Sequence, residues 1–146
     1  MTHAYDFAES GIDYAQKNGA SYAEARVFDG QARSFVLQNG NLISGFSSPL
    51  LGIGFRVLVQ GGLAFCSVNQ LSRKNVEDAL KTAIKMAKLS NPKEKILFGD
   101  VVSNEANWKV DFKENLLDIN NETIITLLKE MDKIGEKNAI STRMFL

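Results

Sequence analysis

Very few side chains in this sequence could carry out catalysis or bind a metal ion. The 146 residues include one histidine, His3, and one cysteine, Cys66. A single imidazole and a single thiol exclude an intramolecular disulfide and any site that needs two His or two Cys ligands. His3 lies in the N-terminal residues, which are usually mobile, so no Ser-His-Asp or Cys-His arrangement can be built around it. We therefore predict no catalytic residue and no metal ligand.

Arg56 is the strongest candidate for a functional residue, because it is a charged side chain inside an otherwise apolar predicted strand. A guanidinium in such a place needs a carboxylate or carbonyl partner, or an exposed position at a strand edge. Ser67 faces Arg56 in the predicted hairpin described below, and Asn69 follows the same strand. Arg56, Ser67 and Asn69 are therefore candidate contact residues.

The other motifs favour ordinary structural roles. Gly52-Ile53-Gly54 precedes a predicted strand, whereas a phosphate-binding glycine loop follows a strand and opens a helix. Cys66 alternates with its neighbours in a strand, which is typical of a small buried side chain. Four lysines share one face of a predicted helix without interleaved aromatic residues, as on a solvated face: Lys74, Lys81, Lys85 and Lys88.

Length, composition and charge indicate a single soluble domain. Apolar residues make up 45% and charged residues 23% of the chain. Lys plus Arg number 17 and Asp plus Glu number 17, so the zero net charge gives no general field for nucleic acid or an anionic membrane. No apolar run approaches the roughly 20 residues of a membrane span, and the first residues lack the charged region followed by an apolar one that is typical of a secretory leader. We expect a cytoplasmic protein that binds neither nucleic acid nor membrane.

The first half of the chain predicts a helix followed by strands. Helical spacing from Tyr5 to Ala15 ends at Asn18-Gly19, and the stretch from Ala20 to Asp29 alternates like a strand. Asn39-Gly40 then predicts a two-residue hairpin turn, because both central positions need positive φ. In that register, one face of the hairpin carries Phe35, Leu37, Leu42 and Phe46.

A second hairpin is predicted around Gly61-Gly62, between strands Gly54–Gln60 and Leu63–Val68. This turn would pair Arg56 with Ser67 on a mixed face. It would pair only apolar residues on the other face, namely Phe55 with Val68, Val57 with Cys66, and Val59 with Ala64. Ser47-Ser48-Pro49 is expected to be a loop that separates the two hairpins.

The second half predicts two helices joined by a long connection. Ser72 is the expected N-cap of a helix that runs to about Leu89 and is ended by Asn91-Pro92. Asn121 and Gly135 bound a further helix, whose apolar face is expected to consist of Ile124, Leu127, Leu128, Met131 and Ile134. A last strand is predicted from Ile140 to Leu146. Its apolar end fits either a strand docked on the sheet or a chain that continues beyond it.

Together these elements predict an α+β fold: an N-terminal helix, an antiparallel sheet from two consecutive hairpins, covering helices and a final strand. We expect residues 1–92 to form an α+β core domain. Residues 93–120 are expected to be an extended connector, because they show no sustained periodicity. Residues 121–146 supply the last helix and strand.

Several of these motifs, in this order and spacing, resemble the N-terminal region of the TldD/PmbA family, metallopeptidases that are also named modulators of DNA gyrase. The resemblance covers residues from about Tyr5 to Pro92 and departs from the family pattern at Leu63-Ala64, where a Trp-Gly pair is common. It rests on Gly19-Ala20-Ser21-Tyr22-Ala23-Glu24-Ala25-Arg26, Asn39-Gly40, Gly52-Ile53-Gly54-Phe55-Arg56-Val57, Phe65-Cys66-Ser67 with Asn69, and the helix that follows Ser72. From Pro92 onward the resemblance rests on layout alone.

The resemblance implies a zinc-dependent peptidase for the full-length family member and no cofactor for this chain. The family's metal site, a His-Glu-x-x-x-His motif plus a later Cys, lies downstream of the matched region, and no such motif occurs between Met1 and Leu146. Residues 121–146 would then lead into a C-terminal catalytic domain. The resemblance also implies a homo- or heterodimer with a homologous subunit and a cavity for peptide substrates. We expect Arg56, Ser67 and Asn69 to contact that subunit or to line the cavity.

We therefore expect a non-catalytic N-terminal domain that contributes to subunit assembly and to the peptide-access cavity. A self-standing protein-interaction module is the alternative. Such a module would pair another chain along an exposed strand edge through main-chain hydrogen bonds.

Overall fold

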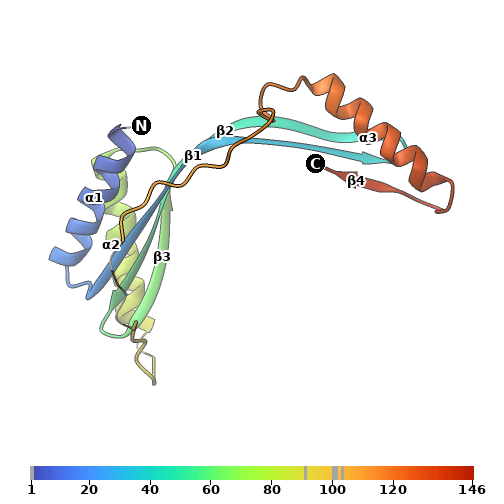
Figure 1. Ribbon diagram of the computed structural model, residues 1–146. Coiled ribbons are helices and arrows are strands. Elements are labelled where there is room, and N and C mark those ends of the chain that lie inside the picture. Colours follow the sequence, from blue (N-terminus) through green and yellow to red (C-terminus); the bar gives the residue numbers. More distant parts are fainter. Residues whose placement is uncertain (1, 91, 100–101, 103) are drawn as a thin grey trace. The chain divides into compact units, whose positions relative to one another are not determined.

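The computed structural model describes residues 2–90, 92–99, 102 and 104–146. Its elements follow the order α1 (Thr2–Lys17), β1 (Tyr22–Gln38), β2 (Asn41–Val59), β3 (Gly62–Val68), α2 (Arg73–Ser90), α3 (Asn121–Glu136) and β4 (Arg143–Phe145). The strands form one sheet in the order β3-β2-β1-β4, in which β2 pairs antiparallel with β3 and β1 pairs antiparallel with β4 (Figure 1). The α+β prediction is confirmed.

The chain divides into two compact units, and each is built from two separate stretches of sequence. Residues 1–30 and 49–101 make up unit 1, and residues 31–48 and 102–146 make up unit 2. Strands β1 and β2 contribute residues to both units. Each unit therefore has its own hydrophobic core, and the two strands are common to both.

Unit 1 is a sheet with α1 and α2 packed on one face (Figure 1). The alternation of β2 sends every second side chain toward the helices, and these side chains are buried: Ile53, Phe55, Val57 and Val59. The apolar stripe of α2 packs on them through Val76, Leu80, Ala83, Ile84 and Ala87. Ser72 caps α2 as predicted, because its Oγ accepts a hydrogen bond of 3.1 Å from the Asn75 amide.

The turn between β2 and β3 differs from the prediction by one position. Gln60 and Gly61 occupy it, with φ of 54° and 86°, and Gly62 is already the first residue of β3. Gly62 is a glycine for another reason: a Cβ there would lie 2.1 Å from the carbonyl oxygen of Ala87 in α2. The close approach of helix and strand, and not the turn, therefore requires this glycine.

Because the turn lies one position earlier, each residue of β2 pairs with the β3 residue two positions before the predicted partner. Arg56 lies opposite Phe65 and not Ser67, and Ser67 lies opposite Gly54. On the helix-covered face Phe55 pairs with Cys66 and Val57 with Ala64. An even shift keeps each side chain on its predicted face, so the prediction of the buried face holds although the predicted pairs are wrong.

The first hairpin has the predicted turn, since Asn39 and Gly40 adopt φ of 48° and 74°. The predicted loop at Ser47-Ser48-Pro49 is wrong, because β2 runs without interruption from Asn41 to Val59. Likewise, β1 continues past Asp29, where the predicted alternation ends, and reaches Gln38. Pro49 lies outside the stretch of β2, Ile53–Val59, that pairs with β3.

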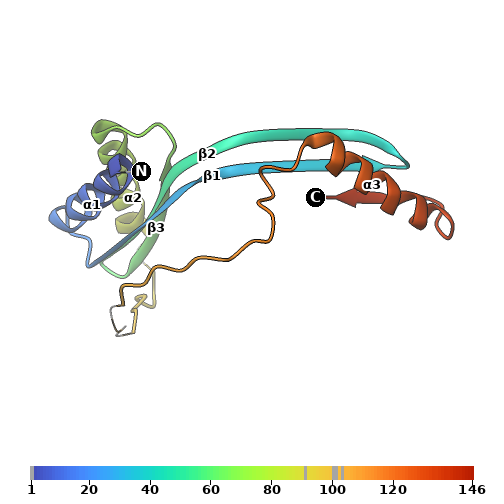
Figure 2. The same ribbon diagram turned by 45° about the horizontal axis from the view of Figure 1, so that its top comes forward.

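Unit 2 packs α3 against the β1–β2 hairpin, with β4 beside β1 (Figure 2). Its core consists of Phe35, Leu37, Ile124 and Leu128. Three residues of the predicted helix stripe are largely exposed instead, namely Leu127, Met131 and Ile134, as are Leu42 and Phe46 of the predicted hairpin face. The buried row of α3 runs through Ile124 and Leu128 to Asp132, four residues apart at each step.

The ends of α3 and the final strand also need correction. Asn120, not Asn121, is the N-cap, because its side-chain oxygen accepts a 2.7 Å hydrogen bond from the Thr123 amide. The helix passes Gly135 and ends at Glu136. The last strand is shorter than predicted, since β4 spans only Arg143–Phe145. Among the residues described, no helix is both long and apolar enough to cross a membrane.

Candidate functional site

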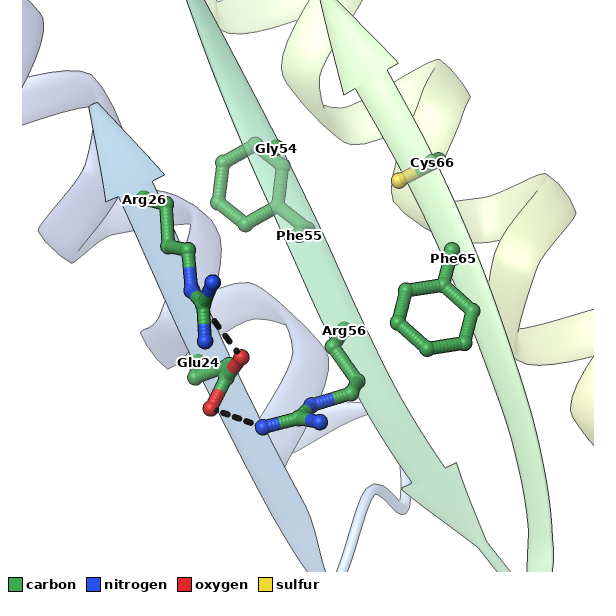
Figure 3. A pocket seen from close by; sticks show the side chains of 7 residues that line it. All are labelled: Glu24, Arg26, Gly54, Phe55, Arg56, Phe65 and Cys66. Atoms are coloured by element: carbon green, nitrogen blue, oxygen red, sulfur yellow. Dashed lines mark hydrogen bonds and ion pairs between the residues drawn. The ribbon is translucent and has the colours of Figure 1, made fainter. Parts of the chain in front are cut away.

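The face of the unit 1 sheet opposite the helices carries an ordered group of charged and aromatic side chains (Figure 3). Alternation in β1 places Ala23, Ala25 and Val27 against the core, and therefore turns Tyr22, Glu24, Arg26 and Phe28 to the other face. Arg56 of β2 and Phe65 of β3 lie on this same face as cross-strand neighbours. We call the group formed by Tyr22, Glu24, Arg26, Arg56 and Phe65 the open-face cluster.

Glu24 is the centre of the open-face cluster. Its Oε2 accepts a 2.6 Å hydrogen bond from the Tyr22 hydroxyl. The same oxygen lies 2.6 Å from Nη2 of Arg56 (Figure 3). Its other carboxylate oxygen lies 3.6 Å from Nε of Arg26. Glu24 is thus the carboxylate partner that the position of Arg56 demands, and both side chains are about a quarter exposed, at 24% and 28%.

These contacts fix the protonation states of the cluster. The hydrogen bond from Tyr22, followed by that from Arg56, holds the pKa of Glu24 below its ordinary value. The same bond to Glu24 raises the pKa of Tyr22, and the bond to Glu24 raises the pKa of Arg56. At neutral pH the cluster therefore holds one carboxylate and two guanidinium groups, an excess of one positive charge.

Phe98 lies over part of this face. Its ring centroid is 4.7 Å from that of Tyr22, and the Arg56 guanidinium carbon lies 5.3 Å from the Phe98 centroid. The Nε of Arg56 is buried without a hydrogen-bond partner, whereas Arg26 remains 81% exposed. Arg56 is therefore fixed by packing and by Glu24, and Arg26 is the guanidinium that an approaching molecule meets first.

The predicted site residues line three shallow hollows. Arg56 lines one of about 210 Å³, together with Glu24, Arg26 and Phe65, and one of about 590 Å³, together with Tyr22 and Phe98. Ser67 and Asn69 line another of about 380 Å³, next to Phe28 and Gly52. The structure therefore does not bring Arg56 together with Ser67 and Asn69, and their contact with a partner remains a prediction.

The side chains at these positions are suited to recognising another molecule. Cys66 lines the same hollow as Glu24 and Arg56, but burial raises the pKa of its thiol to about 11, which suppresses the reactive thiolate. Within the described ranges, no three His, Cys, Asp or Glu side chains gather in a way that could hold a metal ion. Two guanidinium groups beside exposed aromatic rings suit a carboxylate or a carbonyl next to an apolar group.

Sequence reasoning missed the partners of Arg56. The signal was available for Glu24 and Tyr22, since both lie on the polar side of an alternating strand that must neighbour β2. Sequence reasoning also missed Asp132, which accepts a hydrogen bond from the Gly40 amide at the hairpin turn. Its signal was that it is the one acid in the buried row of α3. Phe98 gave no such signal, because it lies in a segment without periodicity.

Comparison with known proteins identifies the domain that carries this cluster. A model of a protein family, described as PmbA/TldA metallopeptidase domain 1, matches residues 23–87, which contain Glu24, Arg26, Arg56 and Phe65. The chain carries the N-terminal domain of the TldD/PmbA family. This TldD/PmbA domain is 31% identical to a metalloprotease of Methanocaldococcus jannaschii over 119 residues, or 75% of the chain and 26% of that protein.

Solved structures share the fold of this TldD/PmbA domain. A candidate modulator of DNA gyrase from Bacteroides thetaiotaomicron aligns with 97% of the chain and 36% of its own, at a TM-score of 0.69 and 19% identity. TldE from Thermococcus kodakarensis aligns with 96% of the chain and 34% of its own, at a TM-score of 0.62 and 20% identity. The chain thus spans about a quarter to a third of the proteins that it matches.

Proposed function

We propose that this chain is the non-catalytic N-terminal part of a TldD/PmbA-type metallopeptidase. In this role it contributes to subunit assembly and to the cavity through which peptides reach the catalytic site. The observation that supports this most is the open-face cluster, which offers side chains for recognition and has all its members except Tyr22 within the stretch that matches the family, residues 23–87. The proposed partners are a homologous subunit, identical or not, and a peptide substrate, in the cytoplasm.

The proposal assigns each part of the chain a task. Residues 1–92 form the recognition domain, residues 93–120 connect, and residues 121–146 lead into the catalytic domain. Arg26 binds a carboxylate or carbonyl of the peptide or partner subunit, Arg56 supports it through Glu24, and Ser67 and Asn69 contact the same partner beside Phe28. The described residues do not fit a zinc site, so the zinc of the full-length protein would be held by the catalytic domain.

The first test is the native gene beyond the codon for Leu146. We expect a continuing reading frame that encodes a His-Glu-x-x-x-His motif and a later Cys, whereas a stop codon there contradicts the proposal. A second test adds zinc to the 146-residue chain. Its melting temperature should not change, because a ligand stabilises only a protein that binds it.

A third test addresses the open-face cluster in the full-length protein. Arg26→Gln should weaken peptide hydrolysis or subunit association by about tenfold, the loss expected of one charge-assisted hydrogen bond. Lys74→Gln is the matched control, because Lys74 is similarly exposed at 87% and lies on α2. Equal behaviour of the two variants would remove Arg26 from the proposed contact surface.

The alternative, a self-standing interaction module that uses a strand edge, is favoured by one observation. Residues 41–47 of β2 are all exposed. A chain that has no catalytic domain in its native gene, but binds another protein through this edge, would establish the alternative.

A further inference from the structure

The longest uncharged stretch of the chain lies in its first hairpin. From Ser34 to Phe55 the sequence contains no Asp, Glu, Lys or Arg, although charged residues make up 23% of the whole chain. This stretch comprises the end of β1, the Asn39-Gly40 turn and most of β2. Soluble proteins usually place charges on exposed strands because unguarded edges pair with other chains. An exposed strand without charges therefore indicates a surface that another chain covers in the assembled protein.

Residues 41–47 of β2 form such an edge. Strand β3 pairs with β2 only from Ile53 to Val59, and the sheet order places no other strand on this side of β2 within the described part of the chain (Figure 2). Three apolar side chains of the edge are about half exposed: Leu42 at 45%, Ile43 at 55% and Phe46 at 52%. Their main-chain groups and their apolar surface are thus open to another strand.

We infer that this edge pairs antiparallel with the same edge of a second copy of the chain, about a two-fold axis at Ser44. The inference rests on the proposed role in subunit assembly and names the surface that performs it. In a symmetric pair of this kind, both copies use the same residues. Each edge is then occupied by the other copy, so the assembly stops at a dimer.

The sequence of the edge is complementary to itself in this register. Leu42 of each copy lies opposite Phe46 of the other, which gives two aliphatic–aromatic pairs on one face. On the other face the bulky side chain of Ile43 lies opposite Gly45, which has none to clash with it. Ser44 meets its own copy on the axis. With no charge in the strand, two identical copies meet without repulsion.

The decisive experiment measures the dimer dissociation constant of the 146-residue chain by sedimentation equilibrium. Leu42→Lys and Phe46→Glu should each weaken the dimer by about tenfold or more, because each puts a charge against an apolar partner. The double variant should recover most of the loss, since each new lysine then lies opposite a new glutamate. Leu127→Lys is the control: Leu127 is 51% exposed on α3, outside the edge, and its substitution should have no effect.

A cross-linking measurement fixes the register and does not depend on the charged variants. In a Cys66→Ser background, Ser44→Cys should form a disulfide-linked dimer, because residues opposite each other lie about 5 Å apart, within the reach of a disulfide. Asn41→Cys should not, because the two copies of residue 41 would lie about 20 Å apart along the strands.

The outcomes separate this inference from the proposed function. A wild-type dimer that is insensitive to Leu42→Lys, or a double variant no better than the single ones, overturns the edge pairing and leaves subunit assembly intact. A chain that is monomeric at every concentration overturns both. A monomer whose residues 41–47 gain amide protection only when an extended peptide is added overturns the pairing and assigns the edge to peptide binding.

Discussion

Replacing Gly62 with alanine would place a methyl group inside the contact between β3 and α2. The added Cβ would lie 2.1 Å from the Ala87 carbonyl oxygen and 2.3 Å from Oγ of Ser90. Nonbonded heavy atoms pack at about 3.5 Å, so the methyl group would be more than about 1 Å too close. The Ala87 oxygen belongs to the backbone, and the helix can therefore relieve the clash only by moving as a body.

That movement would disturb the packing of α2 on the sheet. Val76, Leu80 and Ala83 would separate from the buried face of β2, which is the surface that keeps unit 1 folded. Overpacking of a core usually costs about 1–3 kcal/mol, and a backbone clash belongs at the upper end, so we expect about 3 kcal/mol. For a unit of this size, the melting temperature should fall by roughly 12–24 °C.

The measurement is thermal unfolding of the 146-residue chain, followed by circular dichroism. Gly54→Ala is the matched control on the opposite face of the same pair of strands, because a Cβ there meets no atom within 4 Å. The control should change the melting temperature by only a few degrees, corresponding to about 0.5 kcal/mol. Equal stability of the two variants would refute the conclusion that helix packing requires Gly62.

Three further predictions concern single contacts. Tyr22→Phe should lower the free energy of unfolding by about 1 kcal/mol at neutral pH, discounted for partial exposure. The folded-state pKa of Glu24 is lowered, so the stabilisation by its carboxylate is present above its ordinary pKa and disappears as the pH falls through the folded value. The difference in unfolding free energy between Tyr22→Phe and the wild type, measured by urea titration, should therefore be smaller at acid pH than at neutral pH. Asp132→Ala should speed hydrogen exchange of the Gly40 amide and cost about 2–3 kcal/mol, whereas Asp132→Asn, which keeps an acceptor, should cost less; equal costs would contradict the hydrogen bond. Iodoacetamide should leave Cys66 unlabelled at neutral pH until urea unfolds the chain, since burial raises the pKa of its thiol to about 11, and rapid labelling of the native chain would show an accessible thiolate.

Local chemistry predicted the features that a few neighbouring residues decide. Asn39-Gly40 could be identified as a turn because two adjacent positive φ values suit few other dipeptides. The need of Arg56 for a carboxylate followed from a charge in an apolar strand. Both conclusions depend on the immediate surroundings, which the sequence displays directly.

Features that depend on distant residues could not be predicted in the same way. Ser47-Ser48-Pro49 has the composition of a loop, yet it is strand because β1 continues beside it. The turn could be placed at Gln60-Gly61 or at Gly61-Gly62 from the sequence. Only the approach of Ala87 to Gly62 shows which glycine is needed for packing. Glu24 was visible as a polar residue in a strand, but its place next to Arg56 required the order of the strands.

The interleaved organisation of the two units has a consequence for synthesis on the ribosome. Unit 1 can close only after residues 49–101 have emerged, so β1 and the first hairpin are translated before the unit that contains the start of β1 is complete. Unit 2 must wait longer still, because β4 supplies its last strand at residues 143–145. The uncharged hairpin is therefore exposed from its own emergence until residues 143–145 have been translated, and this nascent segment is where a chaperone would be needed.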